Sequence, residues 1–492
     1  MLTEFFIKIP YLLYFIPLLG SLFINFISGK RFLTNCTYSI LLILTLLAFK
    51  LIFHIDNYND ILIINSSNKY SVIGSEFKIG LYNVFILITI LFVNFVGFAN
   101  YIHEIVLNKK SDTTQIKHFF SIYLIYIFST VGILMTTNIF HLFIFLEIYS
   151  FCMYMMVTVY KKHDLTVLSY KYFSNNIVGS ILSMLTIFYI ILYFNTSNMF
   201  VIKQQLITIS IKDNIDIFLM FILFICSIVM KFFNTNTSKH YNTDNVGINF
   251  LSISNIFINT LLGIYLLNEV VYFIFGGHSI INLLYIDKLI IISTAIIIIY
   301  NSCMLFTEKY TNTVFSIFTR LNLINFGFLL LISLLTTDIT MSLIFLIDFI
   351  SIDMLLYFLS AYMSAKYGTN NISILNNNQI IKCFLIFIIL FKLFLPIGTS
   401  LYTNKLFIDY IFNTQNTLLI IPFIISKIAM LFLLYQIISE KIQLSYNKDR
   451  ILNKKYITML LYSIILIFLF VIFLNIFIDI IDIPLPSIFS KN

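Results

Sequence analysis

Residues 141–160 read HLFIFLEIYSFCMYMMVTVY, an apolar run with one carboxylate, Glu147, near its middle. About 20 residues of α-helix cross the hydrocarbon core of a bilayer, so the run predicts a membrane-spanning helix. An ionised side chain at mid-bilayer costs at least about 2.5 kcal/mol and is retained where it faces protein, water or an opposite charge. The helical neighbours of Glu147, at positions 143, 144, 150 and 151, are Phe, Ile, Ser and Phe. Its partner must therefore come from another helix; the alternative is a protonated glutamate that serves packing.

The composition of the whole chain agrees with a membrane protein. Of its 492 residues, 60% are hydrophobic and 11% are charged, whereas a soluble domain carries about 25% charged residues. The five cysteines lack the spacing of a metal site or disulfide framework, and no nucleotide-binding motif is present. The net charge of +8 indicates loops beside an anionic membrane face rather than nucleic acid. The abundant Ile, Phe, Tyr, Asn and Lys have AT-rich codons, which favours a mitochondrial genome.

Apolar runs of spanning length recur along the chain, roughly fourteen in all, and predict an all-α, multi-pass membrane protein. The expected spans are 5–27, 37–55, 81–103, 118–137, 139–160, 167–194, 216–235, 247–272, 288–307, 314–336, 340–365, 379–413, 416–439 and 456–480. Basic residues gather in the odd-numbered connections, and the thirteenth holds Lys441, Lys448, Arg450, Lys454 and Lys455. Under the positive-inside rule these connections face the matrix or cytoplasm, and both termini lie on the opposite side. The first run reads as a retained span rather than a cleaved presequence.

Two lysines lie at the edges of apolar runs. Lys231 closes DIFLMFILFICSIVMKFF (216–233), and Lys171 opens LSYKYFSNNIVGSILS (168–183). Three polar side chains follow Lys171 at helical spacing and would face a hydrated interior, namely Asn176, Ser180 and Ser183. Each lysine is a candidate partner of Glu147. For each, the alternative is a side chain that snorkels to the membrane surface.

The twelfth span contains a break. Pro396 and Gly398 interrupt it, and proline removes a backbone donor. Freed backbone groups at membrane depth must face protein or water, so the break indicates a polar cavity; a plain proline kink is the alternative. Charged residues lie near it and in the eleventh span: Lys392, Lys405, Asp348 and Asp353. A carboxylate about 7 Å from a lysine stabilises the charged form by about 2 kcal/mol at an effective dielectric of 20. Moving the carboxylate would therefore release a proton.

Between residues 80 and 410 the order and spacing of these motifs resemble the antiporter-like membrane subunits of respiratory complex I, the proton-pumping NADH:ubiquinone oxidoreductase. FLEIYSFCMYMMVTVY matches the segment with the fifth-helix glutamate, at Glu147, and MKFF places Lys231 at the seventh-helix lysine. PIGTSLYTNKLF places Lys405 after the break of the twelfth helix. LSYKYFSNNIVGSILS, with Lys171, matches a Lys-Tyr-Phe run of the subunit 2 family, whereas subunits 4 and 5 share the remaining pattern.

Two departures from the family concern its central relay. The segment after Lys231, NTNTSKHYNTDN, lacks the family's prolines. The eighth-helix lysine is replaced by Asn255, an amide that holds water but takes no proton. The possible substitutes are Lys239, His240 and a water chain along Ser252, Asn255 and Asn259, and further relay candidates are Lys392 and Asp348.

The resemblance implies an antiporter-like fold with broken seventh and twelfth helices and inverted repeats. One membrane domain, 1–492, is expected, with these parts: N-terminal helices (1–115), a first bundle (116–272), a second bundle (273–414) and C-terminal helices (415–492). The residues it implies for proton translocation are Glu147, Lys171, Lys231 and Lys405. No redox chemistry and no cofactor are expected in this chain, because FMN, iron–sulfur clusters and ubiquinone belong to other subunits.

The resemblance also implies partners and a location. The expected partners are antiporter-like subunit 4, the small membrane subunits on the quinone side, accessory subunits and phospholipids such as cardiolipin, with no nucleic acid. The expected location is the mitochondrial inner membrane, with both termini in the intermembrane space. Two alternatives stay open. One is a cation/proton antiporter subunit of the same superfamily; the other is a divergent structural complex I subunit that no longer pumps, which Asn255 favours.

Overall fold

The computed structural model describes residues 2–52, 62–65, 76–107, 113–159, 163–208, 215–232, 246–275, 286–306 and 419–439, with isolated positions between 317 and 408. Two compact units are present. The first comprises Met1–Tyr241 and Ser254–Leu284, and the second comprises Asn242–Ile253 and Tyr285–Asn492. The subdivision predicted from the sequence stays a prediction.

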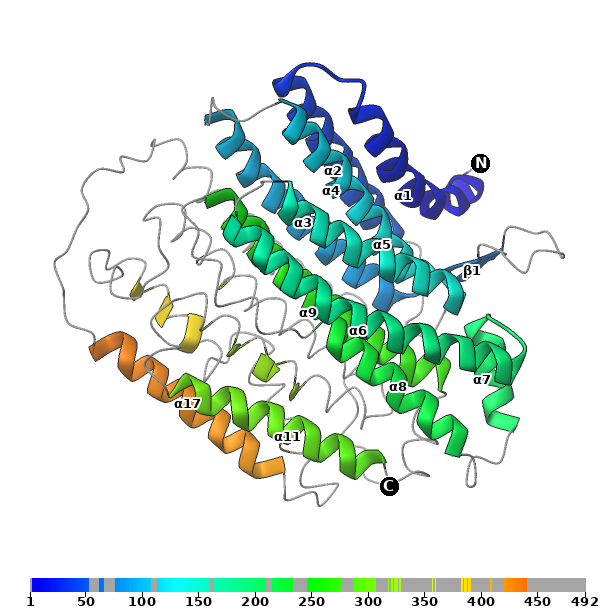
Figure 1. The fold of residues 1–492 in the computed structure, drawn as a ribbon, viewed down its shortest axis with the longest axis vertical. Helices are drawn as coiled ribbons and strands as arrows, with labels where there is room; N and C mark the ends of the chain where they lie inside the picture. The colour runs from blue at the N-terminus through cyan, green and yellow to red at the C-terminus, as the bar shows by residue number, and fades with distance from the viewer. Residues whose placement is uncertain are drawn as a thin grey trace. The chain divides into compact units, whose positions relative to one another are not determined.

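The described chain is almost entirely helical (Figure 1). The helices are α1 (Leu2–Ile24), α2 (Lys30–Ile52), α3 (Leu81–Leu107), α4 (Thr113–Met135), α5 (Ile139–Thr158), α6 (His163–Phe194), α7 (Met199–Thr208), α8 (Ile215–Phe232), α9 (Val246–Asn268), the π-helix η3 (Glu269–Ile274), α11 (Ile286–Leu305) and α17 (Ile420–Ser439). The two strands are β1 (Leu62–Asn65) and β2 (Glu76–Ile79).

The predicted spans agree with these helices within about five residues at each end, except that α2 begins at Lys30, seven residues before the predicted start at 37. Each of the first nine spans, and the thirteenth, coincides with a helix. The others, and the predicted breaks after Lys231 and at Pro396, lie largely or wholly outside the described residues. Six helical segments of the described chain are long and apolar enough to cross a membrane: Lys30–Ile52, Leu81–Phe98, Thr113–Met135, Ile139–Met156, Phe173–Phe194 and Ile420–Ile438. The prediction of an all-α, multi-pass membrane protein is therefore confirmed, while the number of fourteen spans stays a prediction.

Helix α4 lies in the interior of the first unit. Every residue from Tyr126 to Met135 is buried, and a helix that is buried on all sides belongs inside a bundle. It packs mainly against α1 and α5. Gly132 permits the approach of α5, because a Cβ at this position would lie 2.6 Å from a ring atom of Phe145. Small residues at helix contacts are a common means of close packing in membranes.

Helix α6 has one face toward the bundle and another that large apolar side chains cover. It packs against α5 and α8, whereas its exposed positions include Ile181, Met184, Leu185, Phe188 and Leu192. In water such a face would be unfavourable, but in a bilayer it meets lipid or the apolar surface of another membrane chain. Asn176, Ser180 and Ser183 of α6 lie on the opposite, packed side.

One end of the first unit is closed by a layer of short elements that the sequence did not predict. Strands β1 and β2 pair antiparallel, with Leu62 opposite Ile79. Phe77 of β2 bridges to Thr136, after α4, and Asn138 bridges to Asn198, before α7. Helix α7 contacts η3, which continues α9. Four-residue strands carry too short an alternation to stand out in so apolar a sequence, so only their pairing reveals them.

The described part of the second unit includes a helix pair and a buried polar contact. Helices α11 and α17 pack against each other. Arg320 is buried and donates a hydrogen bond to Oδ1 of Asn301 on α11, over 2.9 Å. The buried guanidinium of Arg320 thus has a polar partner within this unit.

The contact of Gly132 with Phe145 predicts a loss of stability when a side chain is added. We expect Gly132→Leu to lower the free energy of unfolding by about 1–3 kcal/mol, because the side chain overpacks the α4–α5 contact. Denaturant titration of the purified protein in detergent measures the change. Gly29→Leu is the matched control, because a Cβ there meets only Phe32, at 3.8 Å. Equal losses in the two variants would contradict the packing assigned to α4 and α5.

Candidate functional site

The position of Glu147 follows from the point at which α5 begins. Asn138 has extended backbone angles, and its side chain accepts hydrogen bonds from the amides of Phe140 and His141. Asparagine is a favoured N-cap because it satisfies amides that the first turn leaves unpaired. The helix then runs unbroken to Thr158, so Glu147 lies in its central turns, away from both membrane surfaces.

Glu147 forms an ion pair with Lys231 of α8. The Lys231 Nζ lies 2.5 Å from Oε1 of Glu147, and the other carboxylate oxygen accepts a 2.8 Å hydrogen bond from the hydroxyl of Ser180 on α6. Three helices therefore converge on one carboxylate. The partner of Glu147 comes from another helix, as the sequence required. The alternative of a snorkelling Lys231 is wrong, because its side chain is only 4% exposed and its ammonium contacts Glu147.

Gly179 explains how Lys231 is held in place. A Cβ on this residue would lie 2.6 Å from Cγ of Lys231 and 3.2 Å from the carbonyl oxygen of Ser227. The absent side chain lets α6 lie directly against the stem of the lysine. The methylene chain is thereby packed between helices, while its ammonium reaches the carboxylate and lies 5.9 Å from the ring centre of Phe143.

The polar stripe predicted on α6 is packed inside the unit. Asn176 and Ser183 are buried, and Ser180 binds Glu147. The amide oxygen and nitrogen of Asn176 have no hydrogen-bond partner among the described residues. Because buried polar groups are ordinarily hydrogen-bonded, this stripe has unused hydrogen-bonding capacity one turn from the ion pair.

A second set of polar and aromatic contacts, not predicted from the sequence, begins at Tyr149 on α5. The hydroxyl of Tyr149 donates to Oδ1 of Asn259 on α9. The ring of Tyr149 stacks on that of Tyr126 at 5.1 Å between centroids, and Tyr123, one turn earlier on α4, donates to Oδ1 of Asn94 over 2.9 Å. The predicted lining residue Asn259 thus contacts α5, the helix that carries Glu147.

The side chains of several other predicted site residues lie outside those that the structure describes. Lys171 lies in α6 and Asn255 in α9, but their side chains are not among those described. Outside the described residues lie Lys239, His240, Asp348, Lys392 and Lys405. Their roles, like the functional roles of Glu147 and Lys231, stay predictions.

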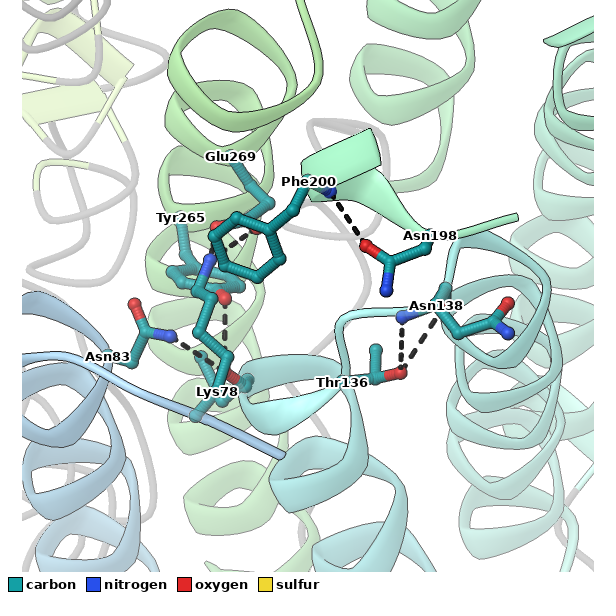
Figure 2. A network of polar contacts seen from close by, with 9 residues as sticks. Lys78, Asn83, Thr136, Asn138, Asn198, Phe200, Tyr265 and Glu269 are labelled. Atoms are coloured by element: carbon teal, nitrogen blue, oxygen red, sulfur yellow. Dashed lines mark hydrogen bonds and ion pairs between the residues drawn. The ribbon is translucent and has the colours of Figure 1, made fainter. Parts of the chain in front are cut away.

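A second buried ion pair, missed in the sequence, joins Lys78 of β2 to Glu269, the first residue of η3 (Figure 2). Lys78 is 1% exposed and Glu269 is 2% exposed. In the sequence, Lys78 lies in the connection between the spans expected at 37–55 and 81–103, where a charged residue does not indicate burial. Glu269 lies within an apolar segment, LLNEVVYFIF (266–275), and this segment was the signal that could have identified it.

The surroundings of this pair are aromatic and amide side chains. The hydroxyl of Tyr265 and the amide of Asn83 both donate to the carbonyl oxygen of Leu134, over 3.0 and 3.1 Å. The Nζ of Lys78 lies 6.0 Å from the centre of the Tyr265 ring. Desolvation by burial lowers the pKa of Lys78, Glu269 opposes that effect, and Lys203 of α7 lowers the pKa further. Within the described residues, no group of three or more His, Cys, Asp or Glu side chains is arranged to hold a metal ion.

The fold is shared with chains of solved structures, among them two chains of membrane complexes. A chain of the membrane-bound sulfane sulfur reductase, an archaeal respiratory membrane complex, aligns with a TM-score of 0.77 over 96% of both chains at 16% identity. A chain of the Mrp complex from Dietzia sp. aligns with a TM-score of 0.70 at 13% identity, over 88% of this chain and 79% of that one. No family model and no curated protein matches the sequence. The likeness shows that this chain shares the fold of those two chains of membrane complexes, while the predicted broken seventh and twelfth helices and inverted repeats stay predictions.

The close approach at Gly179 predicts that a single methyl group disturbs the ion pair. We expect Gly179→Ala to push α6 away from α8, to lengthen the 2.5 Å contact between Lys231 and Glu147, and to destabilise the protein by roughly 1–3 kcal/mol. A cryo-EM structure and a melting curve of the variant measure both effects. Val178→Ala, on the exposed face of α6, is the control. An unchanged ion pair in Gly179→Ala would refute the assigned packing.

Proposed function

We propose that this chain is a core antiporter-like membrane subunit of a proton-pumping respiratory complex, namely subunit 2 of NADH:ubiquinone oxidoreductase in the mitochondrial inner membrane. The observation that carries the proposal is the ion pair between Glu147, in the central turns of an apolar helix, and the buried Lys231. Ionisable residues inside membranes mark proton or ion pathways by default, because their presence there is costly. The fold shared with a chain of an archaeal respiratory membrane complex supports it, as does the order of motifs in the sequence.

The geometry of the pair suggests how charge and proton would be coupled. In contact, the carboxylate of Glu147 stabilises the ammonium of Lys231 inside a desolvated bundle. At an effective dielectric of 20, separating unit charges from about 4 Å to about 7 Å weakens their attraction by roughly 2 kcal/mol. That loss corresponds to roughly a 30-fold change in proton affinity. A rearrangement that moves Glu147 away would therefore make Lys231 give up its proton, and the return of the carboxylate would favour its uptake.

The surface around Glu147 supports membership of a larger assembly. Its side chain is 35% exposed even though it pairs with Lys231. Large apolar side chains are exposed on the same helix, among them Phe140, Ile144 and Phe151. A carboxylate facing lipid is unfavourable, so a neighbouring membrane subunit would cover it. Conformational change could then reach Glu147 from that subunit, while FMN, iron–sulfur clusters and ubiquinone carry the electrons elsewhere in the complex.

The proposal predicts that Lys231 must be able to release its proton. In the intact complex we expect Lys231→Ala to lower the number of protons pumped per electron. Lys231→Arg should do the same while keeping the ion pair, because a guanidinium stays protonated. Proton uptake and NADH oxidation, measured together in sealed vesicles, give the ratio. Lys117→Arg, at the start of α4, is the control. An unchanged ratio in both Lys231 variants would overturn the proposal.

A cation/proton antiporter subunit is the second candidate function, and the likeness to a chain of the Mrp complex favours it. The two functions imply different assemblies. A complex I subunit is expected to copurify with flavin and iron–sulfur subunits in equal amounts, so the purified complex would show flavin absorbance and NADH oxidation. Purification through a tag on this chain, followed by mass spectrometry and flavin analysis, distinguishes them. A flavin-free complex of membrane subunits alone would favour the antiporter. A flavin-containing complex whose Lys231 variants pump normally would favour the structural subunit.

A further inference from the structure

The ion pair between Lys78 and Glu269 plays no part in the function proposed above. It joins residues 191 positions apart in the chain and is buried more completely than the pair at Glu147. It lies at the end of the first unit that β1, β2, α7 and η3 close, a layer we call the hairpin end. An ion pair desolvated to this degree requires an explanation.

A purely mechanical role for the pair accounts poorly for its chemistry. The hairpin already contacts the bundle through the bridge from Phe77 to Thr136 and through edge-to-face contacts of Phe77 with Tyr11 and Tyr14. Removing two charges from water costs several kcal/mol for each ion, and apolar residues of similar volume often stabilise a fold as well or better. A chemical role therefore explains a lysine and a glutamate at this place better than a purely structural role does.

The groups around the pair come from three elements, α3, α7 and α9, and keep it in a poorly hydrated, partly polar environment. The ring of Tyr82 on α3 stacks on that of Tyr265 on α9 at 6.1 Å between centroids, and Tyr265 interacts with Glu269. Asn268 of α9 donates to the hydroxyl of Tyr82. Lys203 of α7 adds positive charge that opposes the charged form of Lys78. Burial and Lys203 lower the pKa of Lys78, so its proton is held less tightly than that of a free lysine.

The backbone at Glu269 is also unusual. The α-helix α9 changes at this residue into the π-helix η3, which runs to Ile274. A π-helical turn leaves the regular hydrogen-bond ladder, and such turns occur frequently at functional sites. Glu269 therefore lies at the point where regular α-helical hydrogen bonding ends.

Two helices connect this pair to the pair at Glu147 within the first unit. Asn259, on α9, accepts a hydrogen bond from Tyr149, two residues after Glu147 on α5. Tyr265 follows Asn259 along α9, and Glu269 is the first residue of η3, which continues α9 toward the hairpin end. Helix α9 thus contacts α5 through Asn259 and leads to Tyr265 and to Glu269 of η3, so the two ion pairs lie on contacting elements of the first unit.

We propose that Lys78 and Glu269 form a second proton-exchanging pair of this subunit, acting at the hairpin end in series with Glu147 and Lys231. The proposal rests on the function proposed above. In the resting pair the amine of Lys78 holds the proton and the carboxylate of Glu269 accepts its hydrogen bond. Loss of one proton to water at the hairpin end leaves a neutral amine beside the carboxylate. One proton arriving through the bundle then restores the ammonium, so one enters for each that leaves.

One conservative variant distinguishes a role of the pair in proton exchange from a purely structural role. Lys78→Arg keeps the positive charge and the ion pair but cannot release its proton. In the intact complex we expect it to assemble normally and to lower the protons pumped per electron by as much as Lys231→Arg. Because the pairs act in series, the double variant should lose no more than either single one. Glu269→Gln, which keeps a hydrogen-bond acceptor, should show the same loss. Lys117→Arg is the control for the substitution itself.

The pumping ratios of these variants distinguish the two proposals. A normal ratio in Lys78→Arg, when Lys231→Arg has lost pumping, overturns this inference and leaves the proposed function intact. A normal ratio in both Lys231→Arg and Lys231→Ala overturns the proposed function itself. Additive losses in the double variant would show that the two pairs do not act in series. If Lys78→Arg fails to assemble while Glu269→Gln assembles and pumps normally, the pair is structural and the inference is wrong.

Discussion

The cost of placing a charge in a medium that solvates it poorly governs the described interior of this protein. Helices can cross a bilayer because their backbone groups are satisfied internally, and apolar side chains then face lipid or each other. A charged side chain in that setting needs a partner within a few ångströms. The described interior meets this requirement in two ways: by direct pairing, as for Glu147 with Lys231 and Lys78 with Glu269, and by hydrogen bonding, as for Arg320 with Asn301.

Close helix packing is what makes such pairing possible. Gly179 lets α6 approach the stem of Lys231, and Ser180, the next residue, is thereby brought to the carboxylate of Glu147. Gly132 plays the corresponding part between α4 and α5, where it accommodates the ring of Phe145. Helix association in membranes lacks the hydrophobic driving force that operates in water, so contact between small residues and interhelical hydrogen bonds supply much of the stabilisation. Helix packing and ion pairing therefore depend on the same residue: Gly179 lets α6 approach α8 and also positions Lys231.

The two ion pairs differ in how far the sequence could reveal them. Glu147 stands out because it interrupts a long apolar run, and its need for a partner on another helix follows from its helical neighbours. Lys231 stands at the end of such a run, so a surface position was an equal alternative until the structure placed it inside. Lys78 lies in a short alternating segment that resembles a surface loop, and Glu269 lies near the end of a span. Neither position indicates burial, because each is buried only by segments distant in the sequence.

The sequence by itself determined that the chain is a multi-pass α-helical membrane protein, where most described helices begin and end, and which charges lie within apolar runs. Hydrophobicity and helix length are properties of contiguous residues, and they can be read locally. Only the tertiary structure decided that Glu147 pairs with Lys231, that Ser180 completes the contact, and that the hairpin carries Lys78 to Glu269. These pairings join residues 84 and 191 positions apart, and the chain in between leaves no local signal of which charges will meet.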